Sequence, residues 1–390
     1  MPSENQLEKS DKFKWFDATL ISVAHFIHDI YTSFLAPLQT VIMDAFSLNH
    51  SMFGLLSVFQ RIPTLLNPFI GILADKVRIR YLMIFSPLVT ALCMSLIGQA
   101  QSFIGLSILV FISGISSSMF HVPTPVMIKH ISGNKTGKGM SFYMVGGEFA
   151  RTIGPLIILG AVDLWAFEGT FRLIPGGLVA SFILFIRFRK TDLRKSVKDR
   201  YSGKLYWDEV QKHWNLLLII ALIILFRGGI KSILTYYLMG FMEELGMSRW
   251  LSGIALSVVY LSGTLGVLAS GTISDYFGKR KTLLIASVLS PIFVFSFMQF
   301  HSIAGFIFLA LAGFVLLSPT PVFLSIVNSL KSHHLPFLNG IFMTSNFLAS
   351  ALSTMLTGVT IDLWGYNSAM YLMLAVSALV IPLIFMMKLK

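Results

Sequence analysis

Long apolar stretches alternate along this chain with short segments that carry most of its charges. A helix needs roughly 20 mostly apolar residues to cross the hydrocarbon core of a bilayer, and about twelve stretches reach that length. We place them at about 16–41, 52–75, 81–99, 103–131, 138–162, 170–188, 214–241, 250–275, 282–300, 304–330, 337–361 and 369–387. The pattern therefore predicts an all-α membrane protein with twelve transmembrane helices.

The second half of the chain repeats the first. Gly71 and Asp75, which are followed by a group of cations, return 200 residues later as Gly271 and Asp275. Three further short sequence segments recur at offsets between 196 and 200 residues: Leu56-Ser57-Val58 as Leu256-Ser257-Val258, Asp163-Leu164-Trp165 as Asp362-Leu363-Trp364, and Pro123-Thr124-Pro125-Val126 as Pro319-Thr320-Pro321-Val322. Similarity within one chain at a long period is typical of a duplicated architecture. We therefore expect two pseudo-symmetric six-helix bundles.

Composition agrees with this interpretation. Of the 390 residues, 55% are hydrophobic and only 12% are charged, and the mean hydropathy is +0.76. Such a chain has too few polar residues to cover a soluble core. Six apolar stretches precede and six follow a segment rich in Lys, Arg and Asp. We therefore expect an N-terminal bundle at 1–188, a cytoplasmic linker at 189–213 and a C-terminal bundle at 214–390.

The positive charges collect in alternate loops, and both ends of the chain belong to the positive set. Cytoplasmic loops carry an excess of Lys and Arg, so we expect both termini in the cytoplasm and the protein in the inner (plasma) membrane. The polar leader 1–15 is not typical of a cleavable signal. This topology, together with contacts to anionic lipid, accounts for the net charge of +12 without a nucleic-acid partner. A single Cys, Cys93, provides neither a disulfide nor a zinc framework.

The first apolar stretch contains a polar stripe. His25, His28, Asp29, Thr32 and Ser33 are spaced by three and four, so they share one face of a helix. A charge at the centre of a span costs about 2.5–3.5 kcal/mol on insertion scales and usually has a function. The cluster could relay protons, ligate a metal or fix helix packing through hydrogen bonds. We favour proton coupling at Asp29 and predict no metal site.

Two later stretches contain further polar groups in apolar surroundings. His121 is followed by Pro123 and Pro125, which lack backbone donors and should kink the helix beside the imidazole. Glu148 and Arg151 are three residues apart and can pair on one helix face. Small residues around them, at 146, 147 and 154, allow another helix to pack closely. We expect His121 and Glu148 to assist proton coupling.

Cations in the apolar stretches outnumber the acids. Arg227 and Lys231 lie four apart, and the offset of 200 maps Asp29 onto Gly229 between them. A cavity shared by the repeats would therefore have an acid on one wall and two bases on the other. The excess charge favours an anionic solute, for which the predicted contacts are Arg61, Arg151, Arg227, Lys231 and Tyr31. The alternative is that these cations only pair with Asp29 and Glu148.

The duplicated loops suggest a conformational latch. A carboxylate and several cations at the end of an apolar helix can bridge neighbouring helices, while the Gly allows close approach. The residues predicted to form it are Gly71, Asp75, Arg80, Gly271, Asp275, Lys279 and Arg280.

The duplicated loops and the basic centre resemble the major facilitator superfamily. The second copy matches the family pattern through Gly278, Lys279 and Arg280, whereas the first has Arg78 and Ile79 at the corresponding Gly and cation. The resemblance extends to its fosmidomycin-resistance efflux branch at His25, Asp29, Phe120-His121, Ser132-Gly133, Val145-Gly146-Gly147, Gly154-Pro155-Leu156 and Arg227. His28, Glu148, Pro123 and Val126 depart from that branch, at positions expected in the cavity. The resemblance implies two six-helix bundles and a transport function.

We therefore predict a secondary active transporter that exports a small anionic or drug-like solute in exchange for protons. The alternative is an uptake or export carrier for a metabolite anion, a siderophore or another metal chelate, and a membrane enzyme or channel is the third hypothesis. The chain lacks an ATP-binding motif and the Gly-x-Ser-x-Gly elbow of a hydrolase, so we expect no enzyme activity and no cofactor. We expect the protein to act as a monomer.

Overall fold

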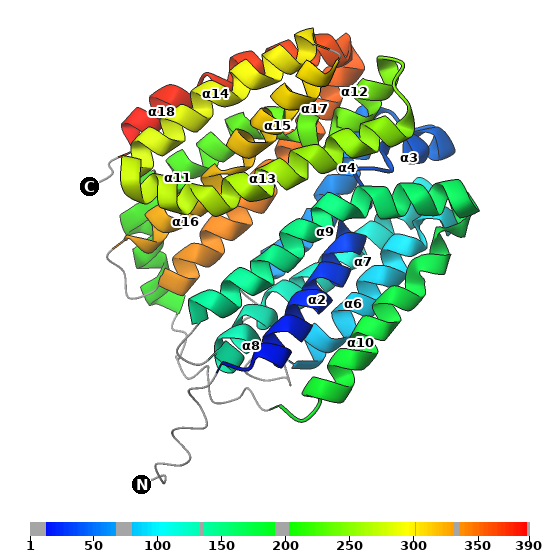
Figure 1. The fold of residues 1–390 in the computed structure, drawn as a ribbon. Helices are drawn as coiled ribbons and strands as arrows, with labels where there is room; N and C mark the ends of the chain where they lie inside the picture. Colours follow the sequence, from blue (N-terminus) through cyan, green and yellow to red (C-terminus); the bar gives the residue numbers. More distant parts are fainter. Residues whose placement is uncertain are drawn as a thin grey trace. The chain divides into compact units, whose positions relative to one another are not determined.

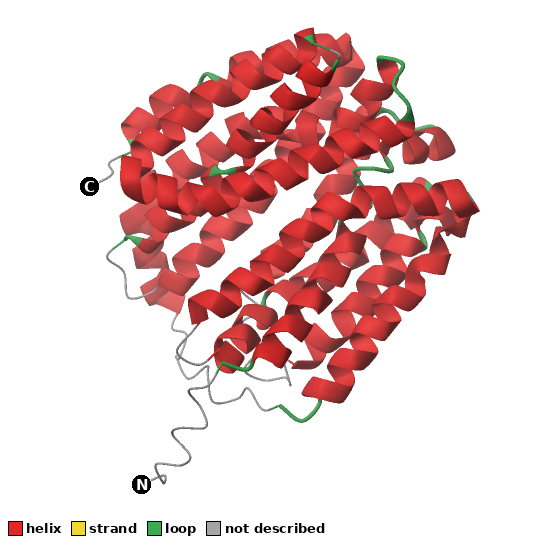
Figure 2. Ribbon diagram, viewed as in Figure 1, coloured by secondary structure: helices red, strands yellow, loops and turns green. Residues whose placement is uncertain are grey.

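The computed structural model describes residues 13–67, 80–132, 136–191, 203–300, 302–330 and 335–387, and every regular element in these ranges is a helix (Figure 2). The predicted all-α fold is therefore confirmed for them. Contacts between residues divide the chain into two compact units: residues 1–34 with 63–200 form unit 1, and residues 35–62 with 201–390 form unit 2.

Unit 1 is built around α2, which packs against α9 and α6, while α6 also packs against α7 and α10 (Figure 1). Its main core includes Ile21, Ile84, Phe120, Ile128 and Leu184, all with 0% exposure. Its helices are α2 (Trp15–Thr32), α6 (Arg80–Ser95), α7 (Phe103–His121), α8 (Pro123–Ser132), α9 (Thr136–Trp165) and α10 (Ile174–Phe188), with the short 3-10 turns η2 (Ile97–Gln99) and η4 (Glu168–Leu173).

Unit 2 contains the helices of the second half and the segment 35–62. In it, α17 packs against both α11 and α4, and α13 packs against α15. The helices are α3 (Gln39–Phe46), α4 (His50–Arg61), α11 (Gly203–Ser232), α12 (Leu238–Glu244), α13 (Arg249–Phe277), α14 (Lys279–Gln299), α15 (Ile303–Leu317), α16 (Pro319–Asn328), α17 (Leu335–Ser377) and α18 (Val380–Met386). A π-helical turn, η5 (Ile233–Tyr237), connects α11 to α12, and the 3-10 turn η1 (Ile62–Leu66) follows α4.

In the part of the chain that the structure describes, nine helical stretches are long and apolar enough to cross a membrane. The bent pair Gln39–Phe46 and His50–Leu66, with an angle of 113° between its parts, brings the number to ten. The longest stretch, Leu338–Met386, has 49 residues and is broken at Gly365, where φ is 75°. At about 1.5 Å per residue it can cross a core of roughly 30 Å twice. The set is consistent with the predicted twelve helices.

The first predicted helix is shorter than expected. We predicted a continuous helix over 16–41, but α2 ends at Thr32 and α3 begins at Gln39. The Thr32 and Ser33 hydroxyls donate to the main-chain oxygens of Asp29 and Ile30. Such bonds compete with the helical pattern, and the Pro37 ring disfavours helix at the residue before it. Two residues of the predicted polar stripe therefore lie at the end of the helix.

We predicted one helix over 103–131 with a kink at the prolines, but the structure has two helices there, because α7 ends at His121 and α8 begins at Pro123. Helix α11 begins at Gly203, inside the segment predicted as a linker, where Lys, Leu and Glu favour helix. The contacts group residues 35–62 with the second half of the chain. The domain boundaries at 188 and 214 stay a prediction.

Candidate functional site

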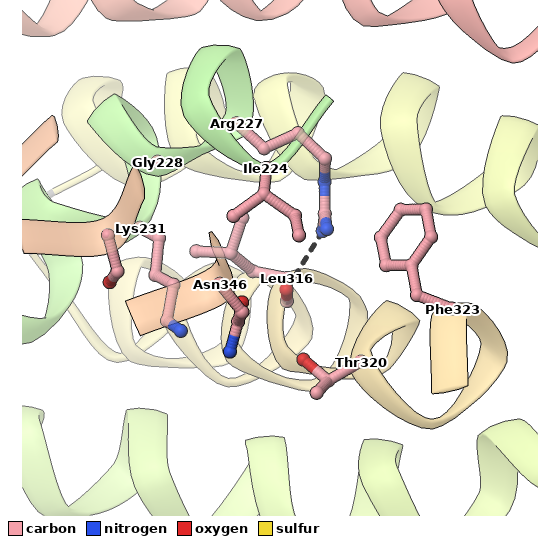
Figure 3. A pocket seen from close by; sticks show the side chains of 9 residues that line it. Ile224, Arg227, Gly228, Lys231, Leu316, Thr320, Phe323 and Asn346 are labelled. Atoms are coloured by element: carbon pink, nitrogen blue, oxygen red, sulfur yellow. Dashed lines mark hydrogen bonds between the residues drawn. The ribbon is translucent and has the colours of Figure 1, made fainter. Parts of the chain in front are cut away.

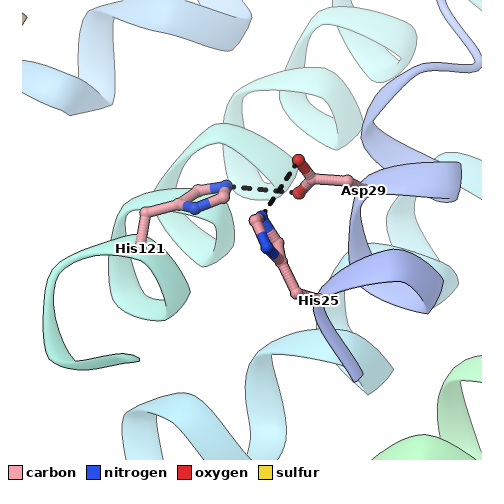
Figure 4. A group of neighbouring side chains, drawn as sticks. All are labelled: His25, Asp29 and His121. Atoms are coloured by element: carbon pink, nitrogen blue, oxygen red, sulfur yellow. Dashed lines mark ion pairs between the residues drawn. The ribbon is translucent and has the colours of Figure 1, made fainter. Parts of the chain in front are cut away.

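Asp29, near the C-terminal end of α2, lies among three imidazoles. Its Oδ1 atom is 2.9 Å from His28 Nδ1 and 3.2 Å from His121 Nε2, and its Oδ2 atom is 3.3 Å from His25 Nε2. Figure 4 shows that His25 and His121 reach the carboxylate from different helices. Asp29 is 1% exposed and His28 is 0% exposed, so the titratable groups at the centre have little contact with solvent. The predicted grouping of these residues is present within unit 1.

A chain of hydrogen bonds leads away from His28. Its Nε2 atom lies 3.1 Å from Thr90 Oγ1, which donates to Ser116 Oγ at 2.8 Å. Ser116 in turn donates to the main-chain oxygen of Ser86 at 2.9 Å. A carbonyl oxygen only accepts, so both hydroxyl hydrogens point away from the imidazole. In this arrangement His28 Nε2 carries a hydrogen and donates it to Thr90.

Tyr143, on α9, orients the other two imidazoles. The His25 Nδ1 atom is 2.7 Å from the Tyr143 main-chain oxygen, and the two rings stack with centroids 4.0 Å apart. The Tyr143 hydroxyl lies 3.0 Å from His121 Nδ1. Because the main-chain oxygen only accepts, His25 Nδ1 carries a hydrogen. The Nε2 atom of each ring is thereby directed toward Asp29.

Helix α9 approaches α2 closely at its small residues, as predicted. A Cβ atom at Gly147 would lie 2.5 Å from His25 Cε1 and 3.0 Å from Asp29 Oδ2. These distances are too short for a side chain. The close packing of α9 against His25 and Asp29 therefore depends on the absence of a side chain at Gly147.

The predicted pair of Glu148 and Arg151 is confirmed. Arg151 Nη1 donates to Glu148 Oε1 at 3.0 Å, and Arg151 Nη2 lies 3.8 Å from Asp29 Oδ2. Arg151 and Glu148 therefore form an ion pair beside the buried acid. The Arg151 side chain is 42% exposed, so part of this pair contacts solvent.

A pocket within unit 2 combines two of the predicted cations with neutral polar groups. Arg227 Nη2 donates to the main-chain oxygen of Leu316 at 2.9 Å, and Arg227 Nε is buried without a hydrogen-bond partner among the described residues. Figure 3 shows the polar ends of Lys231, Asn346 and Thr320 around the same space. The lining residues are Ile224, Arg227, Gly228, Lys231, Leu316, Thr320, Phe323, Asn346 and Ser350.

Arg61 and Tyr31, also predicted as solute contacts, lie elsewhere. Arg61 Nη2 donates to Tyr236 Oη at 3.0 Å, and its guanidinium carbon lies 5.7 Å from the centroid of the Phe347 ring. Tyr31 donates its hydroxyl hydrogen to the main-chain oxygen of Leu173 at 2.6 Å. The predicted wall of cations opposite Asp29 involves both units and stays a prediction.

The cations of the predicted latch bind the main chain within their own units. Arg80 donates to the Thr191 oxygen, beyond the end of α10, and Arg280 donates to the Met387 oxygen, beyond the end of α18. Lys279 Nζ donates to the Ser325 oxygen at 3.0 Å. Two cations separated by the repeat offset therefore make equivalent contacts at helix ends, where the partial charge is negative.

The other latch residues give less support to the prediction. Gly71 and Asp75 lie outside the described residues, and Asp275 is exposed. The close approach expected at Gly271 is absent, because no atom among the described residues would lie within 4 Å of an added Cβ. The latch itself stays a prediction.

Several polar residues at these sites were not predicted from the sequence. They are Thr90, Ser116 and Tyr143 in unit 1, and Thr320, Asn346 and Ser350 in unit 2. They lie on largely apolar helices, and nothing in the sequence next to them indicates that they face these sites. The sequence distinguished Thr320 only as part of the repeated Pro-Thr-Pro-Val segment, in which it corresponds to Thr124.

Residues 21–330 and 219–390 match the family model of the Major Facilitator Superfamily. The match covers most of the chain, which therefore belongs to this superfamily of transporters. It is a multi-pass membrane protein and a carrier of small molecules, as predicted, and is not an enzyme.

Two relatives are named for drug resistance. The chain is 22% identical over 351 residues to the fosmidomycin resistance protein of Escherichia coli, a match that covers 88% of this chain and 85% of the relative. It is 25% identical over 242 residues to the multidrug resistance protein MdtG of Salmonella typhimurium, covering 60% and 59%. A bacterial homologue of the lysosomal transporter Spinster, in an inward-facing and unoccupied conformation, has the same fold, with a TM-score of 0.75, 14% identity, and 95% and 96% of the two chains covered.

Proposed function

We propose that this transporter exports a small anionic or drug-like solute across the inner membrane in exchange for protons. Asp29 is the coupling group, His28 shares its proton, and His25, His121 and Glu148 assist. Arg227 and Lys231 bind the anion, and Arg61, Arg151 and Tyr31 line the route. Both termini lie in the cytoplasm, and the protein acts as a monomer.

The contact between His28 and Asp29 is the observation that carries this proposal. His28 Nε2 donates to Thr90, so the ring already holds one hydrogen there. The 2.9 Å contact between Nδ1 and Asp29 Oδ1 requires a second hydrogen between the two atoms. The pair can hold it as an imidazolium with a carboxylate or as a neutral imidazole with a carboxylic acid. Loss of this proton leaves one uncompensated negative charge in a buried cluster.

Such a charge can couple the loss of a proton to a change of conformation. An uncompensated buried ion costs several kcal/mol, so the deprotonated cluster favours a conformation in which a cation or water reaches Asp29. Arg151, 3.8 Å from Asp29 Oδ2 and partly exposed, is a cation placed to respond. Protonation neutralises the negative charge of the cluster, so Arg151 is no longer attracted to Asp29. Proton binding can therefore bias the helices α2, α7 and α9 between two arrangements.

The pocket in unit 2 supports an anionic solute. Arg227 leaves its Nε group without a partner among the described residues, and Lys231 adds a second positive charge. Fixed cations in an apolar cleft attract anions, and the planar guanidinium suits carboxylate or phosphonate oxygens. Asn346, Thr320 and Ser350 provide neutral groups for the rest of the solute. The names of the two relatives favour export of a drug-like compound.

The test uses the purified chain in proteoliposomes that contain a pH-sensitive dye. A panel of carboxylate, phosphate and phosphonate anions is added outside, without any pre-existing pH gradient. We expect at least one anion to change the internal pH in protein-containing vesicles and not in protein-free vesicles. Solute flux without accompanying proton movement would reject proton coupling.

A further inference from the structure

We propose that His25, Asp29 and His121 form a binding site for one divalent transition-metal ion of the borderline class, such as Zn²⁺, Co²⁺ or Ni²⁺. Two imidazole nitrogens and a carboxylate are a donor set suited to these ions. Asp29 is both a ligand of this site and the proposed proton-coupling group. The metal site therefore rests on the proposed function and adds metal ions to what the same cluster can bind.

The donor atoms already have suitable separations. His25 Nε2 lies 3.3 Å from Asp29 Oδ2, and His121 Nε2 lies 3.2 Å from Asp29 Oδ1. All three donors lie within 4.8 Å of one another. Two ligands bound at about 2.0–2.1 Å to a tetrahedral ion are roughly 3.3 Å apart. An ion can therefore be bound with small movements of the two rings.

The hydrogen atom on His25 is on the side of the ring away from the site. Its Nδ1 atom donates to the Tyr143 main-chain oxygen at 2.7 Å, which leaves Nε2 with a lone pair in the neutral ring. The 3.3 Å separation from Asp29 is not oriented as a hydrogen bond, and His25 Nε2 is buried without such a partner among the described residues. In metal-binding imidazoles the N–H group of the second nitrogen characteristically donates to a carbonyl oxygen in this way.

His121 and Asp29 have similar outer contacts. The Tyr143 hydroxyl lies 3.0 Å from His121 Nδ1, on the far side of the ring from Asp29. His28 Nδ1 is hydrogen-bonded to Asp29 Oδ1, and its Nε2 donates to Thr90, so both ring nitrogens are occupied and His28 orients the carboxylate without being a ligand. Each of the three proposed ligands is therefore held by a second residue.

Helix α9 can pack directly against these atoms because residue 147 has no side chain. A Cβ atom there would lie 2.7 Å from His25 Nε2 and 3.0 Å from Asp29 Oδ2. The backbone of α9 thus borders the donor atoms. The adjacent pair of Arg151 and Glu148 adds no net charge, so Asp29 provides the negative charge that attracts a cation.

The inference is tested with CoCl₂ alone on the full chain, purified in detergent and freed of metals with a chelator. Co²⁺ coordinated by nitrogen and oxygen ligands has visible absorption bands that report its coordination. We expect one equivalent to bind and Zn²⁺ to displace it. His25→Ala, His121→Ala and Asp29→Asn should each weaken binding by more than about tenfold, as should Gly147→Ala through the steric contact.

His130→Ala is the matched control, because His130 lies on α8 of the same unit and is exposed. It should bind Co²⁺ as the parent does. His121→Gln keeps much of the shape of a partly exposed side chain, so it provides a second variant if Asp29→Asn does not fold. Spectra that are unchanged in His25→Ala and His121→Gln, or the absence of any Co²⁺ spectrum in the parent, would overturn the site.

The result is separable from the proposed function. Proton-coupled anion flux is measured in chelator-containing buffers, whereas Co²⁺ binding is measured without solute or membrane. Coupled flux with no Co²⁺ site would reject the metal inference alone. A Co²⁺ site without coupled flux would reject the transport mechanism and leave the metal site intact.

Discussion

His121 Nε2 lies 3.2 Å from Asp29 Oδ1, although the two residues are far apart in the sequence. The imidazole belongs to the last residue of α7, where the helix ends before Pro123, and the carboxylate belongs to α2. A helix end is easier to move than a helix interior, because fewer backbone hydrogen bonds resist the movement. The contact therefore connects the buried acid to a place where the chain can change direction.

We expect Thr90→Val to impair the proton-sharing pair. The substitution preserves the side-chain shape but removes the hydroxyl that contacts His28 Nε2, and a buried unsatisfied group costs about 1–3 kcal/mol. The midpoint of thermal unfolding in detergent should fall, and proton movement in vesicles should slow. Ser113→Ala is the control, because the buried Ser113 hydroxyl contacts only the Val110 oxygen of its own helix among the described residues. Equal effects of the two variants would show that Thr90 does not support the proton-sharing pair of His28 and Asp29.

A second prediction concerns the start of α4 in unit 2. Asp362 accepts hydrogen bonds at 2.8 Å from the backbone N–H groups of His50 and Ser51, and from the His50 ring. A negatively charged carboxylate at a helix N-terminus stabilises the helix by about 0.3–1 kcal/mol, and the neutral amide loses this contribution. Asp362→Asn should lower the thermal midpoint, whereas Asp44→Asn, at an exposed carboxylate, should not. An unchanged midpoint in the Asp362 variant would show that α4 does not depend on the charge of this carboxylate.

Arg227→Lys distinguishes solute binding from structural pairing. The change keeps the positive charge but removes the planar set of donors. If Arg227 contacts the anion, the variant should be expressed normally and lose most of the thermal stabilisation that the transported anion gives to the parent. Arg172→Lys, at an exposed residue of unit 1, is the control. Full stabilisation of the Arg227 variant would exclude the guanidinium from the solute site.

Spacing along one helix predicted contacts within that helix. His25, His28 and Asp29 were placed on one face by intervals of three and four, and the structure brings the two rings to the same carboxylate. Arg227 and Lys231 likewise line one pocket. These predictions succeed because the helical period alone fixes which residues share a face.

Contacts between helices could not be predicted in this way. Thr90 is one of several hydroxyl residues on the apolar helix α6, and only the packing of α6 against α2 places it beside His28. Tyr143 has no distinctive neighbours in the sequence, yet its main chain and hydroxyl orient two imidazoles. The early end of α2 was missed because Thr32 and Ser33 continued the polar stripe, although their hydroxyls bind the main chain.

Transport by Asp29→Asn in proteoliposomes tests the central claim most directly. The amide preserves the size of the side chain but cannot carry the shared proton. We predict that the variant still exchanges labelled solute across the membrane when no net driving force is applied. We also predict that it no longer accumulates solute when a pH gradient is the sole energy source, whereas Asp44→Asn does both. Accumulation by the Asp29 variant under that gradient would contradict proton coupling through this residue.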